Sequence, residues 1–84
     1  MKFCLITFRS VTPAQRAEAV LRREGMECTI QRTPRWMAEQ GCGYSLRVRL
    51  ADAYSAADLL RRKEVSFRKI YVPLEGGTYE EILV

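Results

Sequence analysis

The chain has 84 residues, of which 48% are hydrophobic, and its 14 basic and 10 acidic residues give a formal net charge of +4. This size and composition are typical of one small globular domain, and the sequence contains no repeat or low-complexity segment. We therefore expect residues 1–84 to form a single domain, with the conformation of residues 76–84 left open. Because basic and acidic residues are interspersed, the positive charge alone does not indicate a nucleic-acid partner.

The beginning of the chain and its cysteines restrict the compartment and the chemistry. The segment MKFCLITFRS has an apolar run too short for a signal peptide or a membrane span, so we expect a cytoplasmic protein with reduced thiols and no membrane contact. The three cysteines form no CxxC pair, and the chain has no histidine, which removes the usual zinc patterns and a Cys-His dyad. The sequence therefore predicts no metal site and no cofactor.

Hydrophobic periodicity predicts secondary-structure elements in the order βαββαβ. A first helix is expected from a Thr12 N-cap, with Pro13 in the first turn, to Gly25, and a second helix follows Asp52. The four strands are expected at residues 2–8, 28–32, 44–50 and 65–72. This order predicts the α+β class and a ferredoxin-like two-layer sandwich, in which two helices cover one face of an antiparallel sheet.

Cys42 is the candidate for chemistry. It lies between Gly41 and Gly43 in the polar connection TPRWMAEQGCG, where glycines on both sides leave the sulfur unshielded. Cys4 and Cys28 lie in the strand-like segments FCLITF and ECTIQ, in which a free thiol usually behaves as a small core hydrophobe. For Cys42, a reactive thiol and a plain loop residue both remain open at this point.

The predicted topology also indicates which residues surround this cysteine. The connection between the second and third strands leaves the sheet at the same end as the turn from the first strand into the first helix. We therefore expect Cys42 near Arg9, Ser10 and Thr12. The positive end of the helix, together with Arg9 or Arg35, would lower the pKa of the thiol and favour the thiolate.

A spaced motif in this connection is characteristic. Thr33, Pro34 and Arg35 are followed by Cys42 and Gly43. Positions outside the connection that contribute to the same pattern are Phe8, Ser10, Ala17, Glu18, Leu21 and Gly25. On these residues, the chain from position 8 to about 50 resembles the selenium/sulfur carrier protein-like domains of small bacterial proteins. Those domains often have serines between the arginine and the cysteine, whereas this chain has AEQG directly before Cys42.

The resemblance implies a carrier rather than an enzyme. The Cys42 thiolate would accept sulfur or selenium as a persulfide or selenosulfide and then release it to an acceptor. The implied partners are sulfur or selenium donor and acceptor proteins, and the sequence does not distinguish the two elements. Arg35 and Arg9 would stabilise the terminal anionic atom, while Thr33 and Pro34 would fix the start of the connection.

Two interpretations without thiol chemistry remain open. One is a module that binds nucleic acid or another anion, because the same topology carries RNA recognition and Arg47 and Arg49 are expected to point outward. The exposed aromatic residues that stack bases are missing from the third strand, which argues against nucleic acid. An assembly module is the other, because the first strand is apolar on both faces, and either a homodimer or the apolar tail after Gly77 would cover the open face. A reversible disulfide between Cys28 and Cys42 would instead make the protein a redox sensor.

Overall fold

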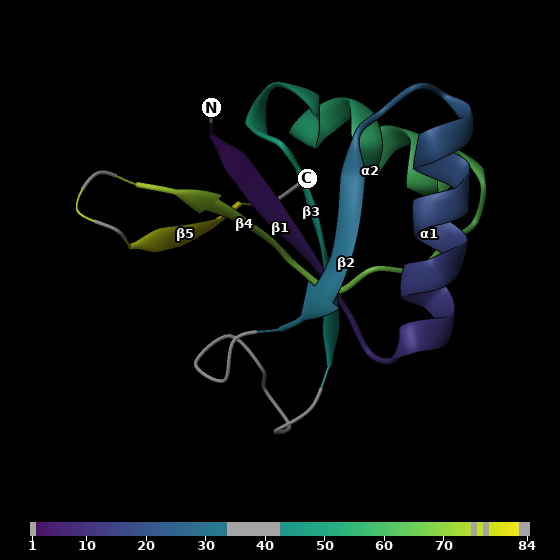
Figure 1. Cartoon of the computed structure of the whole chain (residues 1–84), viewed down its shortest axis with the longest axis horizontal. Coiled ribbons are helices and arrows are strands. Elements are labelled where there is room, and N and C mark those ends of the chain that lie inside the picture. The colour runs from purple at the N-terminus through teal and green to yellow at the C-terminus, as the bar shows by residue number, and fades with distance from the viewer. Residues whose placement is uncertain (1, 34–42, 75, 77, 83–84) are drawn as a thin grey trace.

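The computed structural model describes residues 2–33, 43–74, 76 and 78–82, which form a sheet with helices on one side (Figure 1). The elements are β1 (Phe3–Phe8), α1 (Val11–Arg23), β2 (Cys28–Arg32), β3 (Tyr44–Arg49), the 3-10 turn η2 (Leu50–Asp52), α2 (Ala53–Arg62), β4 (Ile70–Pro73) and β5 (Tyr79–Ile82). All strand pairs are antiparallel, in the order β2-β3-β1-β4-β5. Figure 1 shows α1 and α2 against the same face of this sheet.

The α+β class is confirmed, but the expected count of four strands is wrong. The first four strands lie in the order β2-β3-β1-β4, which is consistent with a ferredoxin-like sandwich, and β5 adds a fifth strand beside β4. The pair Val72 and Glu80 belongs to this added ladder, and the N–H of Leu74 donates to the carbonyl of Thr78 at 2.7 Å. Residues 79–82, in the tail whose conformation the sequence left open, thus form a hairpin with β4.

The fourth strand begins later than its apolar pattern predicts. The N–H of Val65 donates to the Leu60 carbonyl at 2.9 Å and so closes α2. The N–H of Lys69 donates to the side-chain hydroxyl of Thr7 at 3.1 Å, where a regular ladder would use a backbone carbonyl. Regular pairing therefore starts only at Ile70.

The first helix begins earlier than expected, with Ser10 rather than Thr12 as its N-cap. Ser10 has an extended backbone, with φ −152° and ψ 177°, so the chain turns into the helix directly after it. Pro13 still lies in the first turn, where a missing N–H costs no hydrogen bond. Ser10 and all of α1 are described residues, and the Ser10 hydroxyl forms no capping hydrogen bond with this helix.

The core lies between the sheet and the helices. Its largest fully buried side chains are Phe8, Ile6, Leu21, Leu46, Leu60, Ile70 and Val48. The opposite face of β1 is also covered: Leu5 is 4% exposed in the single chain, and Arg47 stacks over the Phe3 ring at 4.3 Å from its centroid. Because Leu5 is already buried, the apolar outer face of β1 does not require a second copy to cover it.

Both helices end in the same backbone arrangement, the Schellman motif. Its hydrogen bonds run from Met26 N–H to Leu21 O and from Gly25 N–H to Arg22 O in α1, and from Val65 N–H to Leu60 O and from Glu64 N–H to Arg61 O in α2. Gly25 takes the left-handed position in α1 with φ 79°, whereas Glu64 takes it in α2 with φ 58°. An L-residue in this region is strained, so the end of α2 is held against its local preference.

We expect Glu64→Gly to raise the free energy of unfolding by about 1 kcal/mol. The glycine removes the strain of the left-handed backbone, and the larger conformational entropy of glycine in the unfolded chain offsets only part of that gain. Urea denaturation should show a higher midpoint with an unchanged slope. Gly25→Ala is the matched control: no atom lies within 4 Å of the added Cβ, so a loss of about 1 kcal/mol would come from φ alone. A less stable Glu64→Gly variant would contradict the expectation.

Candidate functional site

The predicted site residues divide into two groups. Pro34, Arg35, Gly41 and Cys42 lie outside the described residues. Arg9, Ser10, Thr33 and Gly43 are described. Phe8 pairs with Tyr44 and Arg32 with Tyr44, so the end of β1, the end of β2 and the start of β3 meet at one end of the sheet (Figure 1). The described site residues therefore lie on neighbouring segments.

Thr33 and Gly43 close the base of the connection between β2 and β3. The N–H of Thr33 donates to the carbonyl of Gly43 at 3.0 Å, which continues the ladder beyond the Arg32–Tyr44 pair. The hydroxyl of Thr33 also forms a 3.1 Å hydrogen bond with that of Ser45, which is fully buried. One backbone bond and one side-chain bond thus fix the two ends of the connection.

The close approach of β1 leaves little room for a side chain at Gly43. A Cβ at this position would lie 3.1 Å from the carbonyl oxygen of Phe8 and 3.5 Å from the Thr33 hydroxyl. Sequence reasoning assigned Gly43 only to the accessibility of the neighbouring thiol, and the structure adds this steric reason. Gly43 is bonded to Cys42 and lies beside Phe8, the residue before Arg9.

Arg9 and Ser10 lie on the exposed turn between β1 and α1 and line a cavity of about 430 Å³. Ser66 and Arg68, from the connection between α2 and β4, line the same cavity. Sequence reasoning missed these two residues because it placed them in the fourth strand. The basic pair Arg68-Lys69 before a short apolar run was the signal that could have identified them.

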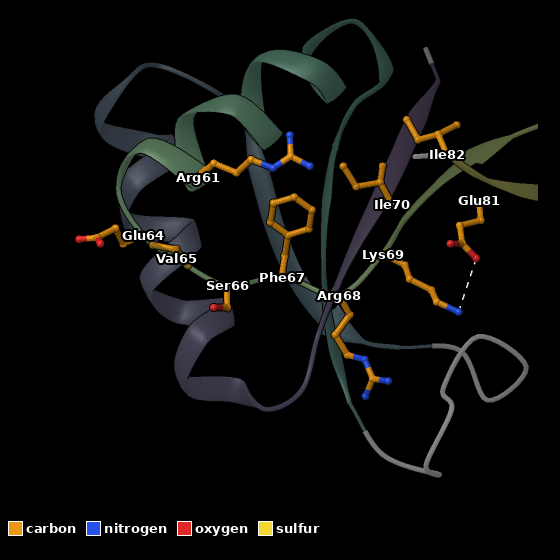
Figure 2. Close-up of a pocket in the computed structure, with 10 residues that line it drawn as sticks. All are labelled: Arg61, Glu64, Val65, Ser66, Phe67, Arg68, Lys69, Ile70, Glu81 and Ile82. Carbon is orange, nitrogen blue, oxygen red and sulfur yellow. Dashed lines mark ion pairs between the residues drawn. The ribbon is translucent and has the colours of Figure 1, made fainter. Parts of the chain in front are cut away.

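A second cavity, of about 470 Å³, lies between the end of α2 and β5 (Figure 2). It shares Ser66, Phe67 and Arg68 with the first. The guanidinium of Arg61 lies 5.4 Å from the centroid of the Phe67 ring, and Lys69 pairs with Glu81 at 3.5 Å. The described residues that line this second cavity therefore include acidic as well as basic groups.

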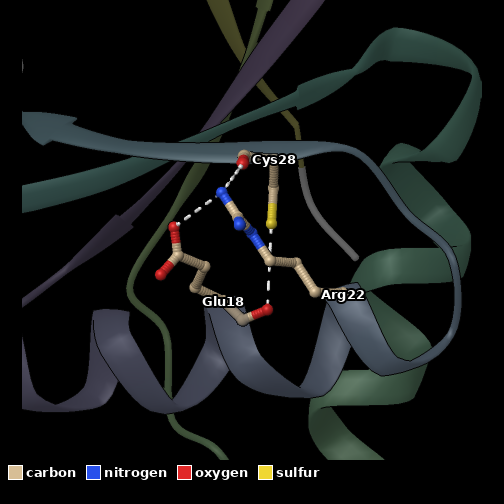
Figure 3. A network of polar contacts seen from close by, with 3 residues as sticks. All are labelled: Glu18, Arg22 and Cys28. Atoms are coloured by element: carbon tan, nitrogen blue, oxygen red, sulfur yellow. Dashed lines mark hydrogen bonds and ion pairs between the residues drawn. The ribbon is translucent and has the colours of Figure 1, made fainter.

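Cys28, at the start of β2, belongs to a compact polar network with Glu18 and Arg22 of α1 (Figure 3). Its thiol donates to the carbonyl of Glu18 at 3.9 Å. Arg22 donates to the carbonyl of Cys28 at 3.1 Å and forms an ion pair with Glu18 at 3.3 Å. Burial raises the pKa of the Cys28 thiol, and the hydrogen bond and charge of Arg22 offset this only in part.

Cys4 is fully buried, and burial raises its pKa from 9.0 to about 11. Cys28 is 4% exposed. The structure therefore confirms that these two cysteines are core residues, and both are neutral thiols at neutral pH. Their sulfur atoms are poor nucleophiles, because the thiolate is the reactive form.

The geometry of β2 bears on a disulfide between Cys28 and Cys42. Cys28 pairs with Val48, five residues along the ladder from the Thr33–Gly43 contact, which is roughly 16 Å at the usual strand rise. Disulfide-bonded residues need Cα atoms within roughly 7 Å. Because Cys42 is bonded to Gly43, this separation argues against the pairing.

A family model described as "Putative Se/S carrier protein-like" matches residues 3–72. The match runs from β1 into β4 and includes Cys42. The chain therefore belongs to the Se/S carrier protein-like family, and the resemblance inferred over residues 8–50 extends over most of the chain. No curated protein and no solved structure matches the chain. Neither helix in the described ranges has the length and apolar character needed to span a bilayer.

We expect Gly43→Ala to lower the free energy of unfolding by about 1–3 kcal/mol, since the added methyl group presses on the Phe8 carbonyl inside the sheet. Hydrogen exchange at the Thr33 N–H should accelerate. In the control Gly76→Ala, no atom lies within 4 Å of the new Cβ, so any loss of stability comes from the φ of 87° alone and local exchange at Thr33 should not change. Unchanged stability and exchange for Gly43→Ala would show that β1 moves aside easily.

We expect iodoacetamide at neutral pH to leave Cys4 and Cys28 unmodified in the folded protein and to label both in urea, as peptide mass spectrometry would show.

Because the folded-state pKa of Cys4 is raised, its contribution to stability is complete below pH 9.0 and falls as the pH rises towards about 11. Cys4→Ala should lose less stability over that alkaline interval. Equal alkaline losses in both proteins, or rapid native labelling, would contradict this assignment.

Proposed function

We propose that the protein is a carrier of sulfur or selenium and that the Cys42 thiol is the attachment point. The observation that supports this most directly is the burial of the other two cysteines. Cys4 and Cys28 are core residues with raised pKa values, so a carrier thiol in this family member is best assigned to Cys42.

The proposed step is a transfer of a sulfane atom from a persulfide donor. The Cys42 thiolate attacks the terminal sulfur of the donor, the donor S–S bond breaks, and a new S–S bond forms on Cys42. The donor leaves as a thiolate and the carrier becomes a persulfide, so no external oxidant is needed. With a selenosulfide donor, the same exchange gives a selenosulfide on Cys42.

The surroundings that we assign to this site would stabilise the anionic terminal atom. Arg35 and Arg9 supply positive charge, and Ser10 a hydroxyl donor. The described contacts of Thr33 and Gly43 support this assignment, because they hold the connection at the end of β1 from which Arg9 and Ser10 emerge.

We further propose that Pro34 stiffens the start of the connection and that Gly41 keeps the thiol accessible. On this proposal the protein is not an enzyme. It works in the cytoplasm between a donor protein and an acceptor protein, each of which supplies the catalytic groups for its own half of the transfer.

Intact mass spectrometry after incubation with a persulfide donor tests the proposal. We expect the mass of one sulfur atom to be added to the native chain and to be removed by dithiothreitol. Cys42→Ser should take up none, whereas Cys28→Ala should behave like the native protein. Uptake that persists in Cys42→Ser, or a native Cys42 that reacts with iodoacetamide but never accepts sulfur, would contradict the carrier function.

A further inference from the structure

β5 is the last strand of the sheet, with β4 on one side of it and no described strand on the other. It lies outside residues 3–72, the range that the family model matches. Figure 1 shows the hairpin of β4 and β5 extending from the sheet on the side away from both helices. The hairpin therefore adds an outer strand to the part of the chain that the family shares.

Pro73 explains why the hairpin leaves β1. In the register of the Leu5–Tyr71 pair, Phe3 would lie opposite Pro73. Proline has no N–H to donate to β1, and regular pairing between β1 and β4 ends at Tyr71. Beyond this point, the hairpin is held by the pairs between β4 and β5.

β5 is nevertheless fixed at both of its ends. Next to the turn, the N–H of Leu74 donates to the carbonyl of Thr78 at 2.7 Å. At the other end, Ile82 packs against the hydrophobic core. An extended backbone is thus already ordered at the edge of the sheet, which lowers the entropy cost of adding another strand.

The backbone groups of Glu81 point to the outer edge of β5. In an antiparallel ladder, the N–H and C=O groups of successive residues point to opposite sides of the strand. The hydrogen bond at Thr78 assigns Glu80 and Ile82, two and four residues later, to the β4 side. Glu81 therefore directs its N–H and C=O towards the position of an added strand.

The side chains of β5 are acidic, although the chain as a whole has a net charge of +4. Glu80 is exposed and forms no ion pair with a described residue, and Glu81 pairs with Lys69 on the β4 side at 3.5 Å. Antiparallel pairing with β5 of a second copy would place glutamates against glutamates, which is destabilising. The outer edge therefore favours a basic strand of another protein over a second copy of this chain.

The cavity of about 470 Å³ adjoins the same edge (Figure 2). Its described lining includes the apolar side chains of Phe67, Ile70 and Ile82. Residues directly opposite each other on neighbouring strands point to the same face of a sheet. The residue of an added strand opposite Ile82 would therefore lie beside this cavity, where an apolar side chain is favoured.

We propose that β5 is a docking edge for an extended basic segment of a partner protein, which pairs with it as a sixth strand of the sheet. Two consecutive basic residues of that segment lie opposite Glu80 and Glu81, and apolar residues flank them opposite Tyr79 and Ile82. Docking does not rest on the carrier chemistry, so Cys42→Ser should bind the segment as the native protein does. Failure of sulfur transfer and failure of docking are therefore separate results.

The probe is the capped peptide Thr-Val-Lys-Lys-Val-Thr, titrated at constant ionic strength and followed by amide chemical shifts. We expect saturable shifts that are largest in β5, including that of Glu81. The peptide Thr-Val-Glu-Glu-Val-Thr should bind at least tenfold more weakly, because its charges repel those of β5. Non-saturable shifts with the lysine peptide, or equal binding of the two peptides, would overturn the proposal.

Glu80→Lys tests the charge by reversing the preference rather than by abolishing binding. It should weaken binding of the lysine peptide about tenfold and strengthen binding of the glutamate peptide by a similar factor, a result that misfolding would not give. Glu24→Lys is the matched control, because it makes the same charge change at the exposed C-cap of α1 and should leave both affinities unchanged. An equal effect of Glu24→Lys would show general charge attraction only and overturn the docking edge.

Backbone methylation separates strand pairing from side-chain attraction. Methylating the peptide N–H groups at alternate residues blocks the hydrogen bonds to β5 in one phase and leaves them intact in the other. We expect one methylated peptide to lose binding and the other to retain it. Equal binding of both methylated peptides would show contact through side chains only and overturn the added strand.

Discussion

The pairing of β1 on both of its edges is the constraint on which the rest of the structure depends. β3 pairs with β1 along its whole length, from Phe3 to Phe8, whereas β4 pairs regularly only at Leu5 and Ile6. At Thr7, hydrogen bonds with Arg68 and Lys69, the two residues before β4, complete the second edge of β1. One of these bonds uses the Thr7 hydroxyl. As a result, three connections leave or enter the sheet at this end: those from β1 to α1, from β2 to β3, and from α2 to β4.

Burial makes the two described cysteines, Cys4 and Cys28, unreactive. A thiol in the core is neutral because desolvation disfavours the thiolate, and Cys4 and Cys28 both show this effect. Arg22 lies close enough to Cys28 to donate to its carbonyl, yet the thiol pKa is still raised, so one nearby cation does not activate a buried sulfur. Accessibility is thus the first requirement for a reactive thiol in this fold, and local charge is the second.

The sequence predicted the elements whose pattern is strong and local. β2 has the predicted bounds, and α1 ends in the expected Gly25 motif, because period-two alternation and a left-handed glycine are signals within a few residues. The pattern wrongly predicted a strand for residues 65–69, because Val65 closes the end of α2 and packs in the core instead. β5 was missed although Gly76 and Gly77 separate it from β4, since charged Glu80 and Glu81 weaken its strand pattern.

The site shows the same division between local and long-range information. Arg9, Ser10, Thr33 and Gly43 could be found from a motif and the expected topology. Arg68 could not, because its place beside Arg9 depends on hydrogen bonds that join Thr7 to Arg68 and Lys69, which lie far from Thr7 in the sequence. The tight contact at Gly43 likewise depends on the carbonyl of Phe8, which no local pattern reveals.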